Sequence, residues 1–317
     1  MRKLFVFILC MLFMACPAGC SKAKEAQENA GNVISADDGT VRFTDSLGRE
    51  VTVKESKKTA VLLGSFCDIW VTAGGEVAAT VKDAWTSFDL GLSEDTVNLG
   101  SFLNPDVERL IALAPDLVIA SSGTEAQIGL REVLEAAGIN VCYFEVNGFE
   151  DYLFMLDVCT AITGDREAYE KYGLKVREEL EKEKKRADGS APTVLFIRAA
   201  AGSVKAKGST GTVGGEILKD LGCVNIADSD GTILDDLSLE AIVKADPDYI
   251  FVTTQGEDTE AALSKVREMF SENPAWNSLS AVKNGNYHEI EKELYNSKPN
   301  ARWAEAYRKL ADILYGK

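Results

Sequence analysis

Residues 107–119 read VERLIALAPDLVI, and residues 239–251 read LEAIVKADPDYIF. In both stretches apolar residues recur three and four positions apart, as on one face of a helix, until a Pro-Asp pair is followed by a short apolar run. A helix that leads directly into a buried strand is the repeating unit of a parallel α/β sheet. Glu108 and Glu240 are 132 residues apart, and the Pro and the Asp of the two stretches keep the same separation. This common offset favours a duplicated α/β unit.

Apolar runs and helical patterns alternate along the rest of the chain. Strands are predicted at residues 60–63, 75–80, 117–120, 139–144, 193–197 and 248–252, and helices at residues 66–73, 106–114, 126–137, 214–221 and 239–245. Before them, the turn sequence DSLGR at residues 45–49 separates two stretches of alternating polarity, which predicts a β-hairpin at the start of the first lobe. Strands that alternate with helices at this spacing indicate a mainly parallel sheet covered on both faces.

A helical region separates the two similar halves. Residues 151–162 and 165–186 are both helical in pattern, and the second stretch would span about 33 Å at 1.5 Å per residue. We therefore expect an α/β fold of two Rossmann-like lobes, residues 39–148 and residues 189–317 with the C-terminal helix, with the ligand cleft between them. A long helical connector at residues 149–188 joins the lobes. Because such a connector is stiffer than crossing loops, we expect lobe closure to be small.

The charge balance excludes several kinds of partner. The chain has 317 residues, with 34 Lys and Arg against 50 Asp and Glu, which gives a net charge of −16. That field would repel a nucleic acid, and the sequence has no basic cluster to offset it, so we expect no nucleic-acid partner. His288 is the one histidine, which argues against a catalytic histidine network and against a metal site built from several histidines.

The N-terminus has the features of an export signal. Two basic residues precede an apolar run at residues 4–15, which is shorter than the ~20 residues needed to span a bilayer. The run leads to Pro-Ala-Gly-Cys at residues 17–20, which resembles a bacterial lipobox with Pro in place of the usual Leu. We expect a signal peptide at residues 1–19, a lipid on Cys20 and a flexible tether at residues 20–38, and hence an extracytoplasmic protein anchored to the cell membrane. Ordinary secretory cleavage is the alternative.

Four further cysteines follow the lipobox. Cys67, Cys142, Cys159 and Cys223 include no C-x-x-C pair, which argues against a thiolate metal site or a redox pair. We expect buried free thiols. Export also permits disulfides, and the spacing does not choose among the three possible pairings.

Several segments occur in a characteristic order. After the lipobox, the tether and the Asp-x-x-Gly-Arg hairpin come NPDVERL (104–110), APDLVIA (114–120), LGCVNI (221–226), SLE (238–240) and DPD (246–248). Together with the two lobes and their connector, this order resembles that of the class III solute-binding proteins, which serve ABC importers of iron-siderophores, haem and cobalamin. The resemblance extends over residues 41–315 and rests on order and spacing, since none of the segments is specific by itself.

The resemblance implies transport and not catalysis. It implies that the protein binds a small metal chelate intact, without a cofactor and without a metal ligand of its own, and passes it to a permease dimer with its ATPase. In the family an exposed Glu on each lobe pairs with arginines of the permease, and the matching positions here are Glu108 and Glu240. Two glutamates at duplicated positions suit a pseudo-symmetric partner. Simple solvation of each glutamate is the alternative.

Small molecules bind beyond the carboxyl ends of parallel strands. The segments that follow the predicted strands supply the candidate ligand-binding residues, which are Phe66, Trp70, Trp85, Phe102 and Ser122 in the first lobe and Arg198, Lys205, Lys207, Thr254 and Tyr295 in the second. Aromatic rings offer flat apolar surface, and Arg and Lys bind carboxylates or catecholates. We expect Arg198 to be the main anionic contact, followed by the two lysines. Core packing for each aromatic and a solvated loop for the lysines are the alternatives.

A ferric siderophore suits the basic residues of the second lobe. Haem would need a His or Tyr axial ligand; Tyr295 is a candidate, whereas His288 lies in a strand-like stretch. Cobalamin, which needs apolar walls, stays open. More distant alternatives are an exported α/β enzyme and a surface lipoprotein without a transport role. The enzyme would need a nucleophile–base pair or paired carboxylates, and the adjacent aspartates at residues 37–38 and 235–236 lie in polar stretches typical of loops.

Overall fold

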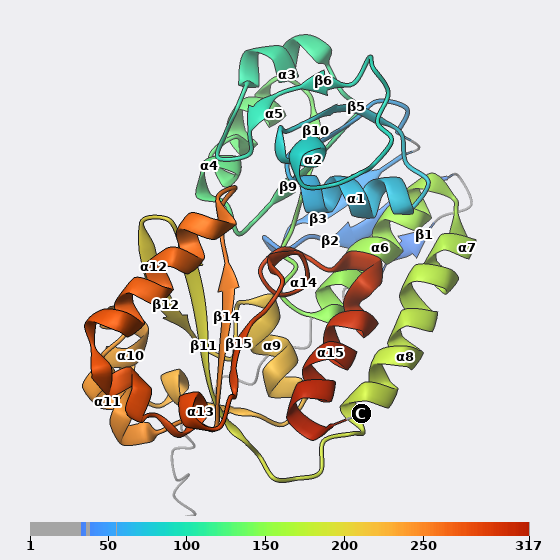
Figure 1. Cartoon of the computed structure of the whole chain (residues 1–317). Helices are drawn as coiled ribbons and strands as arrows, with labels where there is room; N and C mark the ends of the chain where they lie inside the picture. The colour runs from blue at the N-terminus through green and yellow to red at the C-terminus, as the bar shows by residue number, and fades with distance from the viewer. Residues whose placement is uncertain (1–32, 36–38, 55, 317) are drawn as a thin grey trace, which may run out of the picture. The chain divides into compact units, whose positions relative to one another are not determined.

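The computed structural model describes residues 33–35, 39–54 and 56–316 (Figure 1). Residues 31–317 belong to one compact unit. The predicted signal peptide, Cys20 and most of the predicted tether lie outside the described residues. At the end of the predicted tether, β1 (Ile34–Ser35) pairs with β2, so these two residues are part of the folded chain. No helix within the described ranges is long and apolar enough to cross a membrane.

The N-terminal lobe contains a five-stranded sheet in which all neighbours are parallel, in the order β10-β9-β4-β5-β6. Its strands are β4 (Thr59–Val61), β5 (Val77–Thr80), β6 (Val97–Asn98), β9 (Leu117–Ser121) and β10 (Asn140–Phe144). Its helices are α1 (Gly64–Thr72), α2 (Asp83–Thr86), α3 (Val107–Leu113), α4 (Glu125–Ile128) and α5 (Arg131–Ala136), and β7 (Gly100–Ser101) pairs with β8 (Asn104–Pro105). The predicted alternation of strands and helices is confirmed, although the helix predicted at residues 126–137 is divided into α4 and α5.

The predicted hairpin is attached to this sheet by the Asp-x-x-Gly-Arg motif. β2 (Val41–Thr44) and β3 (Glu50–Val53) pair antiparallel. Asp45 Oδ2 accepts a hydrogen bond from Arg49 Nη2 at 2.6 Å, and the same nitrogen donates to the carbonyl of Val141 in β10 at 2.8 Å. The motif therefore holds the hairpin against the edge strand of the parallel sheet.

The C-terminal lobe contains a second sheet in the order β12-β11-β14-β15, with β13 beside the start of β11. Its strands are β11 (Thr193–Ala200), β12 (Ser203–Lys207), β13 (Val224–Asn225), β14 (Tyr249–Thr254) and β15 (Tyr287–Glu289). Its helices are α9 (Val213–Asp220), α10 (Gly231–Asp236), α11 (Leu239–Ala245), α12 (Thr259–Glu272), α13 (Ser280–Lys283), α14 (Lys292–Tyr295) and α15 (Trp303–Tyr315), with 3-10 turns η2 (Ile226–Asp228), η3 (Pro274–Ser278) and η4 (Asn300–Arg302).

One strand of this sheet runs against the others. β12 is antiparallel to β11, whereas β13, β14 and β15 are parallel to their neighbours. Residues 203–207 therefore form the second strand of a hairpin and not a solvated loop, because their backbone groups pair with β11.

The two stretches that predicted a duplication adopt the same local structure. α3 begins after Asp106, whose side chain accepts a hydrogen bond from the first turn, and α11 begins in the same way after Ser238. Both helices end on a left-handed residue, Ala114 with φ of 46° and Asp246 with φ of 44°. This backbone turn ends each helix directly before its Pro-Asp pair.

The aspartates of the two Pro-Asp pairs have matching roles. Asp116 Oδ2 accepts a hydrogen bond from the backbone N–H of Lys58 at 3.0 Å, just before β4. Asp248 Oδ2 accepts one from the backbone N–H of Thr193 at 2.8 Å, at the start of β11. Each aspartate thus connects its own strand to the neighbouring parallel strand, which explains why this residue occurs in both halves.

A helical region connects the two lobes, as predicted (Figure 1). It consists of α6 (Phe149–Thr163), α7 (Arg166–Tyr169), the π-helical turn η1 (Glu170–Leu174) and α8 (Lys175–Lys184). The hydroxyl of Tyr152 on α6 donates to the carbonyl of Tyr172 in the π-helical turn at 2.9 Å. One buried apolar cluster includes Phe144 of the first lobe, residues of α6, and Phe196 and Trp303 of the second lobe. This shared core is the physical basis for expecting little lobe closure.

The four predicted thiols are buried and free, as expected for Cys67, Cys142, Cys159 and Cys223. Burial raises the pKa of the Cys67 thiol and that of the Cys223 thiol to about 12. Neither is a thiolate at neutral pH, so neither is a reactive nucleophile.

Candidate functional site

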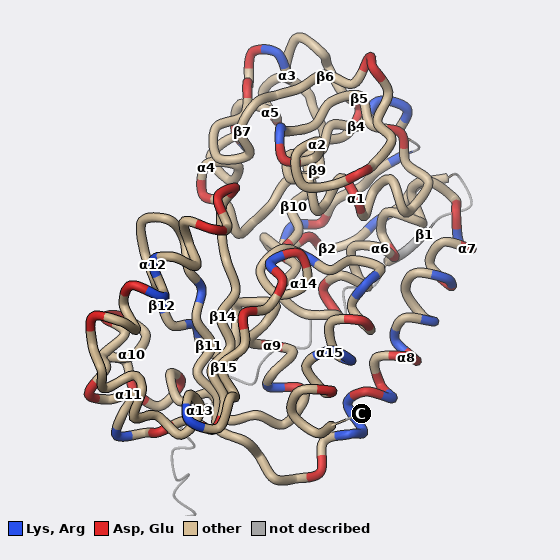
Figure 2. Tube along the Cα trace, in the orientation of Figure 1, with Lys and Arg blue, Asp and Glu red and all other residues tan. Residues whose placement is uncertain are grey.

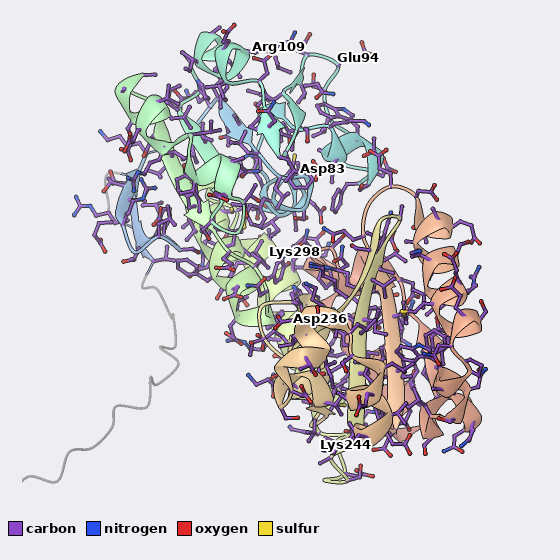
Figure 3. All side chains as sticks on the ribbon, turned by 90° about the vertical axis from the view of Figure 1, so that its left-hand side faces the viewer. Asp83, Glu94, Arg109, Asp236, Lys244 and Lys298 are labelled. Atoms are coloured by element: carbon purple, nitrogen blue, oxygen red, sulfur yellow. The ribbon has the colours of Figure 1, made fainter. Side chains whose placement is uncertain are left out.

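A small pocket lies where the loop after β10 meets the C-terminal lobe. Its lining includes Asn147 from this loop, Arg198 from β11, Lys207 from β12, and Tyr295, Asn296 and Lys298 from the segment around α14. The pocket therefore joins residues far apart in the sequence, from both sides of the helical connector. In Figure 3 the labelled Lys298 lies where the two lobes meet.

The β11–β12 hairpin places its basic side chains together. Arg198 pairs with Lys205 across the two strands, and Phe196 pairs with Lys207. Side chains two residues apart on a strand share one face, so Arg198, Lys205 and Lys207 lie on the same face of the hairpin. Figure 2 shows the basic segments of β11 and β12 next to each other.

The cations of this site have no counter-ions. Within residues 33–35, 39–54 and 56–316, the side chains of Arg198, Lys205, Lys207 and Lys298 form no ion pair and no hydrogen bond, whereas Lys184, Arg186, Arg302 and Lys309 are all ion-paired. Burial lowers the pKa of Arg198, and burial together with the nearby Arg198 and Lys205 charges lowers the pKa of Lys207. Unpaired cations in a partly buried pocket are suited to binding an anion.

The structure brings part of the predicted set together. Arg198, Lys207 and Tyr295 line the pocket, and Lys205 lies beside them on the hairpin. The hydroxyl of Tyr295 donates to the carbonyl of Ala306 at 3.0 Å and the side chain is buried. The side chain is 1% exposed and belongs to the main apolar cluster, so Tyr295 forms part of the wall of the pocket as a core residue and its hydroxyl is not available to a ligand.

Two predicted residues are core residues instead. Phe66 and Trp70 on α1 are each 1% exposed and belong to the main apolar cluster. The indole N–H of Trp70 donates to the carbonyl of Glu76 at 2.8 Å. Since neither side chain reaches solvent, core packing explains both and we do not place them in the site.

The remaining predicted residues lie elsewhere on the lobes. Trp85 on α2 is 39% exposed, Phe102 packs partly against the first lobe, and Ser122 follows β9 with a buried hydroxyl that has no hydrogen-bond partner among the described residues. Thr254 ends β14 and is buried. None of these four lines the pocket.

The site contains residues that the sequence did not reveal. Asn147, Asn296 and Lys298 lie in irregular segments without periodicity, so their proximity to Arg198 follows only from the tertiary fold. Tyr295, three residues before Lys298, is the only residue of this segment that the sequence indicated as a ligand-binding candidate.

The single histidine is structural. The His288 ring stacks at 5.6 Å on Phe251 and at 6.3 Å on Tyr249, and burial lowers its pKa. The paired aspartates at residues 235–236 are exposed on α10 and form no enclosed site. In the described part of the chain, no group of three or more His, Cys, Asp or Glu residues is arranged to hold a metal ion.

Glu108 and Glu240 occupy equivalent positions. Each lies in the first turn of its helix, α3 or α11, and each is exposed. Neither carboxylate has an ion-pair partner in the part of the chain that the structure describes, so both are free to meet an external cation.

Comparison with known protein families identifies the family of this chain. The family described as Periplasmic binding protein matches residues 60–294. This chain belongs to the periplasmic binding protein family. The predicted class III resemblance and the two-lobed α/β fold are both confirmed.

Individual members of the periplasmic binding protein family match over nearly the full length. The chain is 27% identical over 298 residues to the Fe(3+)-citrate-binding protein YfmC of Bacillus subtilis, covering 92% of this chain and 90% of the relative. It is 22% identical to the putative ABC transporter substrate-binding lipoprotein YhfQ of the same organism, covering 96% of both. The fold matches that of Staphylococcus aureus SirA complexed with staphyloferrin B, with a TM-score of 0.66, 22% identity, and coverage of 86% of this chain and 97% of that chain.

Proposed function

We propose that this protein is the substrate-binding component of an ABC importer and that it captures an anionic ferric chelate, a ferric siderophore or ferric citrate. The observation that carries the proposal is the group of four cations without counter-ions at the pocket between the lobes, Arg198, Lys205, Lys207 and Lys298. In a chain with a net charge of −16, such a group selects ligands that bring negative charge. The relative named as a Fe(3+)-citrate-binding protein supports an iron chelate.

Haem and cobalamin fit this pocket less well. An axial ligand for haem would have to come from His or Tyr, but the Tyr295 hydroxyl is hydrogen-bonded to the carbonyl of Ala306, and His288 is stacked on Phe251 and does not line the pocket. Cobalamin carries few charges, so its binding would leave the three cations that line the pocket, Arg198, Lys207 and Lys298, desolvated and unpaired, which is costly.

We propose further that Glu108 and Glu240 dock onto the permease and that a lipid on Cys20 anchors the chain outside the cytoplasm. The duplicated, exposed and unpaired placement of the two glutamates supports docking. The relative named as a lipoprotein supports the anchor. Loss of palmitate labelling in a Cys20→Ala variant would support acylation at this residue, and retained labelling would contradict it.

A thermal-shift panel tests the ligand class. Purified protein is heated with ferric citrate, a ferric complex of 2,3-dihydroxybenzoate, haem or cobalamin. A ligand at about a hundred times its Kd stabilises the folded state by about 2.7 kcal/mol. We expect one or both anionic ferric chelates to raise the Tm. Stabilisation by cobalamin or haem alone would contradict the proposal.

A further inference from the structure

Lys298 occupies an unusual position in the pocket. It lies between α14 and η4, in a segment of irregular backbone, and its side chain lines the pocket together with Arg198 and Lys207. Figure 3 shows it between the lobes, distant from the other labelled lysine, Lys244 on α11. Burial is the largest influence on its ammonium group.

The nearest carboxylates are already engaged. On the first-lobe side, Glu145 and Asp151 attract the Lys298 charge. Asp151 Oδ2, however, accepts hydrogen bonds from the backbone N–H groups of Asn147 and Gly148, both at 2.9 Å. Glu145 Oε1 accepts one from the side-chain amide of Asn147 at 2.8 Å. Neither carboxylate forms an ion pair with Lys298.

The other side of Lys298 carries positive charge. Arg198 repels its ammonium group, and Lys205 and Lys207 lie on the same face of the hairpin as Arg198. The neighbouring Tyr295 is buried and its hydroxyl donates to the carbonyl of Ala306, so it supplies no polar contact to Lys298. Lys298 is therefore partly buried and beside like charge, and both effects favour the neutral amine against the attraction of Glu145 and Asp151.

From this arrangement we infer that Lys298 is a specificity-determining residue whose ammonium group pairs with an anionic chelate in the pocket, and that the neutral fraction of Lys298 takes up a proton from the solvent when such a chelate binds. The inference rests on the proposed function. The neutral amine gains a proton and becomes an ammonium group that pairs with the chelate, and no bond of the chelate is broken. A neutral ligand supplies no charge to stabilise the ammonium group, so Lys298 does not increase its affinity.

The pH dependence of ligand affinity follows from the pKa of Lys298 before the ligand binds. Burial, opposed by Glu145 and Asp151, lowers the pKa of Lys298 to about 8. An anion in contact with the ammonium group raises that pKa in the complex. Below pH 8 most of Lys298 is already protonated, so ligand binding takes up few protons. Above pH 8 most of it is neutral, so most binding events take up a proton. By linkage, the Lys298 contribution makes the affinity about tenfold weaker at pH 9 than at pH 7.

Isothermal titration in buffers of different ionisation enthalpy measures the proton uptake directly. Ferric citrate and the ferric 2,3-dihydroxybenzoate complex are the two anionic probes. For wild-type protein we expect an uptake of about half a proton per site at pH 8, since about half of Lys298 is neutral there.

The decisive variant is Lys298→Arg, because a guanidinium group keeps its charge at every pH used. We expect this variant to bind without the uptake and without the tenfold loss between pH 7 and pH 9. Comparison at equal pH cancels any titration of the chelate itself. A Lys244→Arg variant, changed on the exposed face of α11, is the matched control and should behave as wild type.

A Lys298→Met variant removes the charge altogether. We expect it to bind both anionic probes more weakly at pH 7, by about tenfold or more, with its folding checked by circular dichroism. If Lys298→Met does not fold, Lys298→Arg still decides the question.

The outcomes separate the two proposals. Binding with equal proton uptake in wild type and Lys298→Arg would overturn the inference and leave the proposed function intact. Failure of wild-type protein to bind either anionic probe would overturn both.

Discussion

The side-chain amide of Asn300 donates to Asp68 Oδ2 at 2.7 Å, joining the segment before α15 to α1 of the first lobe across 232 residues of sequence. The same nitrogen donates to the carbonyl of Ser65 at 2.8 Å. Asn300 is buried and has a φ of 53°, a left-handed conformation that asparagine tolerates better than most residues. A second bridge between the lobes is the ion pair of Lys82 and Glu257 at 3.1 Å. These contacts hold the lobes together independently of the connector.

Replacing Asn300 should therefore destabilise the whole unit. Asn300→Ala removes both hydrogen bonds, leaves the Asp68 carboxyl without this donor and places alanine at a positive φ. We expect a loss of about 2–4 kcal/mol in the free energy of unfolding, measured by urea denaturation. Asn284→Ala on the surface is the control. A loss equal to that of the control would show that the contact between α1 and Asn300 does not matter for stability.

The contribution of Asp68 to the free energy of unfolding should fall as the pH rises. Burial raises the pKa of this carboxyl above 3.8, while the Asn300 hydrogen bond opposes the shift. A raised pKa favours the protonated folded form, so this contribution is present below pH 3.8 and is lost as the pH passes the folded-state pKa. Asp68→Asn does not titrate, so its stability relative to wild type should increase from pH 3.5 to pH 7. Asp89→Asn, at an exposed position, is the control. A difference between Asp68→Asn and wild type that does not change with pH would refute the assignment.

Charge reversal at the two proposed docking positions should separate uptake from binding. If Glu108 and Glu240 meet cationic groups of a permease as proposed, a Glu108→Lys/Glu240→Lys variant places like charges against each other at a cost of several kcal/mol, so uptake of the chelate by cells should fall by more than about a hundredfold. Ligand affinity of the purified protein should not change. The control reverses Glu94 and Asp236, which are exposed on the same two lobes (Figure 3). Lost ligand affinity in the Glu108/Glu240 variant, or equal loss of uptake in the control, would refute the docking role.

Local patterns in the sequence were enough to predict the lobes and their duplication. The reason is that helix periodicity and the Pro-Asp pairs report on neighbouring residues, and Asp116 and Asp248 keep their roles within one α/β unit. The strand at residues 203–207 was not predicted because polar and basic side chains dominate its sequence. It is a strand because its backbone pairs with β11.

The site was harder to predict because it is assembled from distant segments. Phe66 and Trp70 follow a strand as ligand residues would, but a sequence does not distinguish an aromatic that faces the pocket from one that faces the core. Lys298 and Asn300 have no periodic context. Arg198, which lines the pocket with Lys298, is 100 residues away from it in the sequence, and Asp68 is 232 residues away from Asn300. Only the tertiary structure identifies them.

The most direct test of the account is the affinity of an Arg198→Gln/Lys207→Gln variant for whichever of the two anionic ferric chelates binds the wild-type protein, measured by isothermal titration at pH 7. Each charge-assisted contact contributes about 1.5–3 kcal/mol, so removing two should weaken binding by about a hundredfold or more. Lys244→Gln, on the far side of the same lobe from the pocket, should bind as wild type (Figure 3). An affinity of the double variant within about twofold of wild type would contradict the claim that the unpaired cations of this pocket hold the ligand.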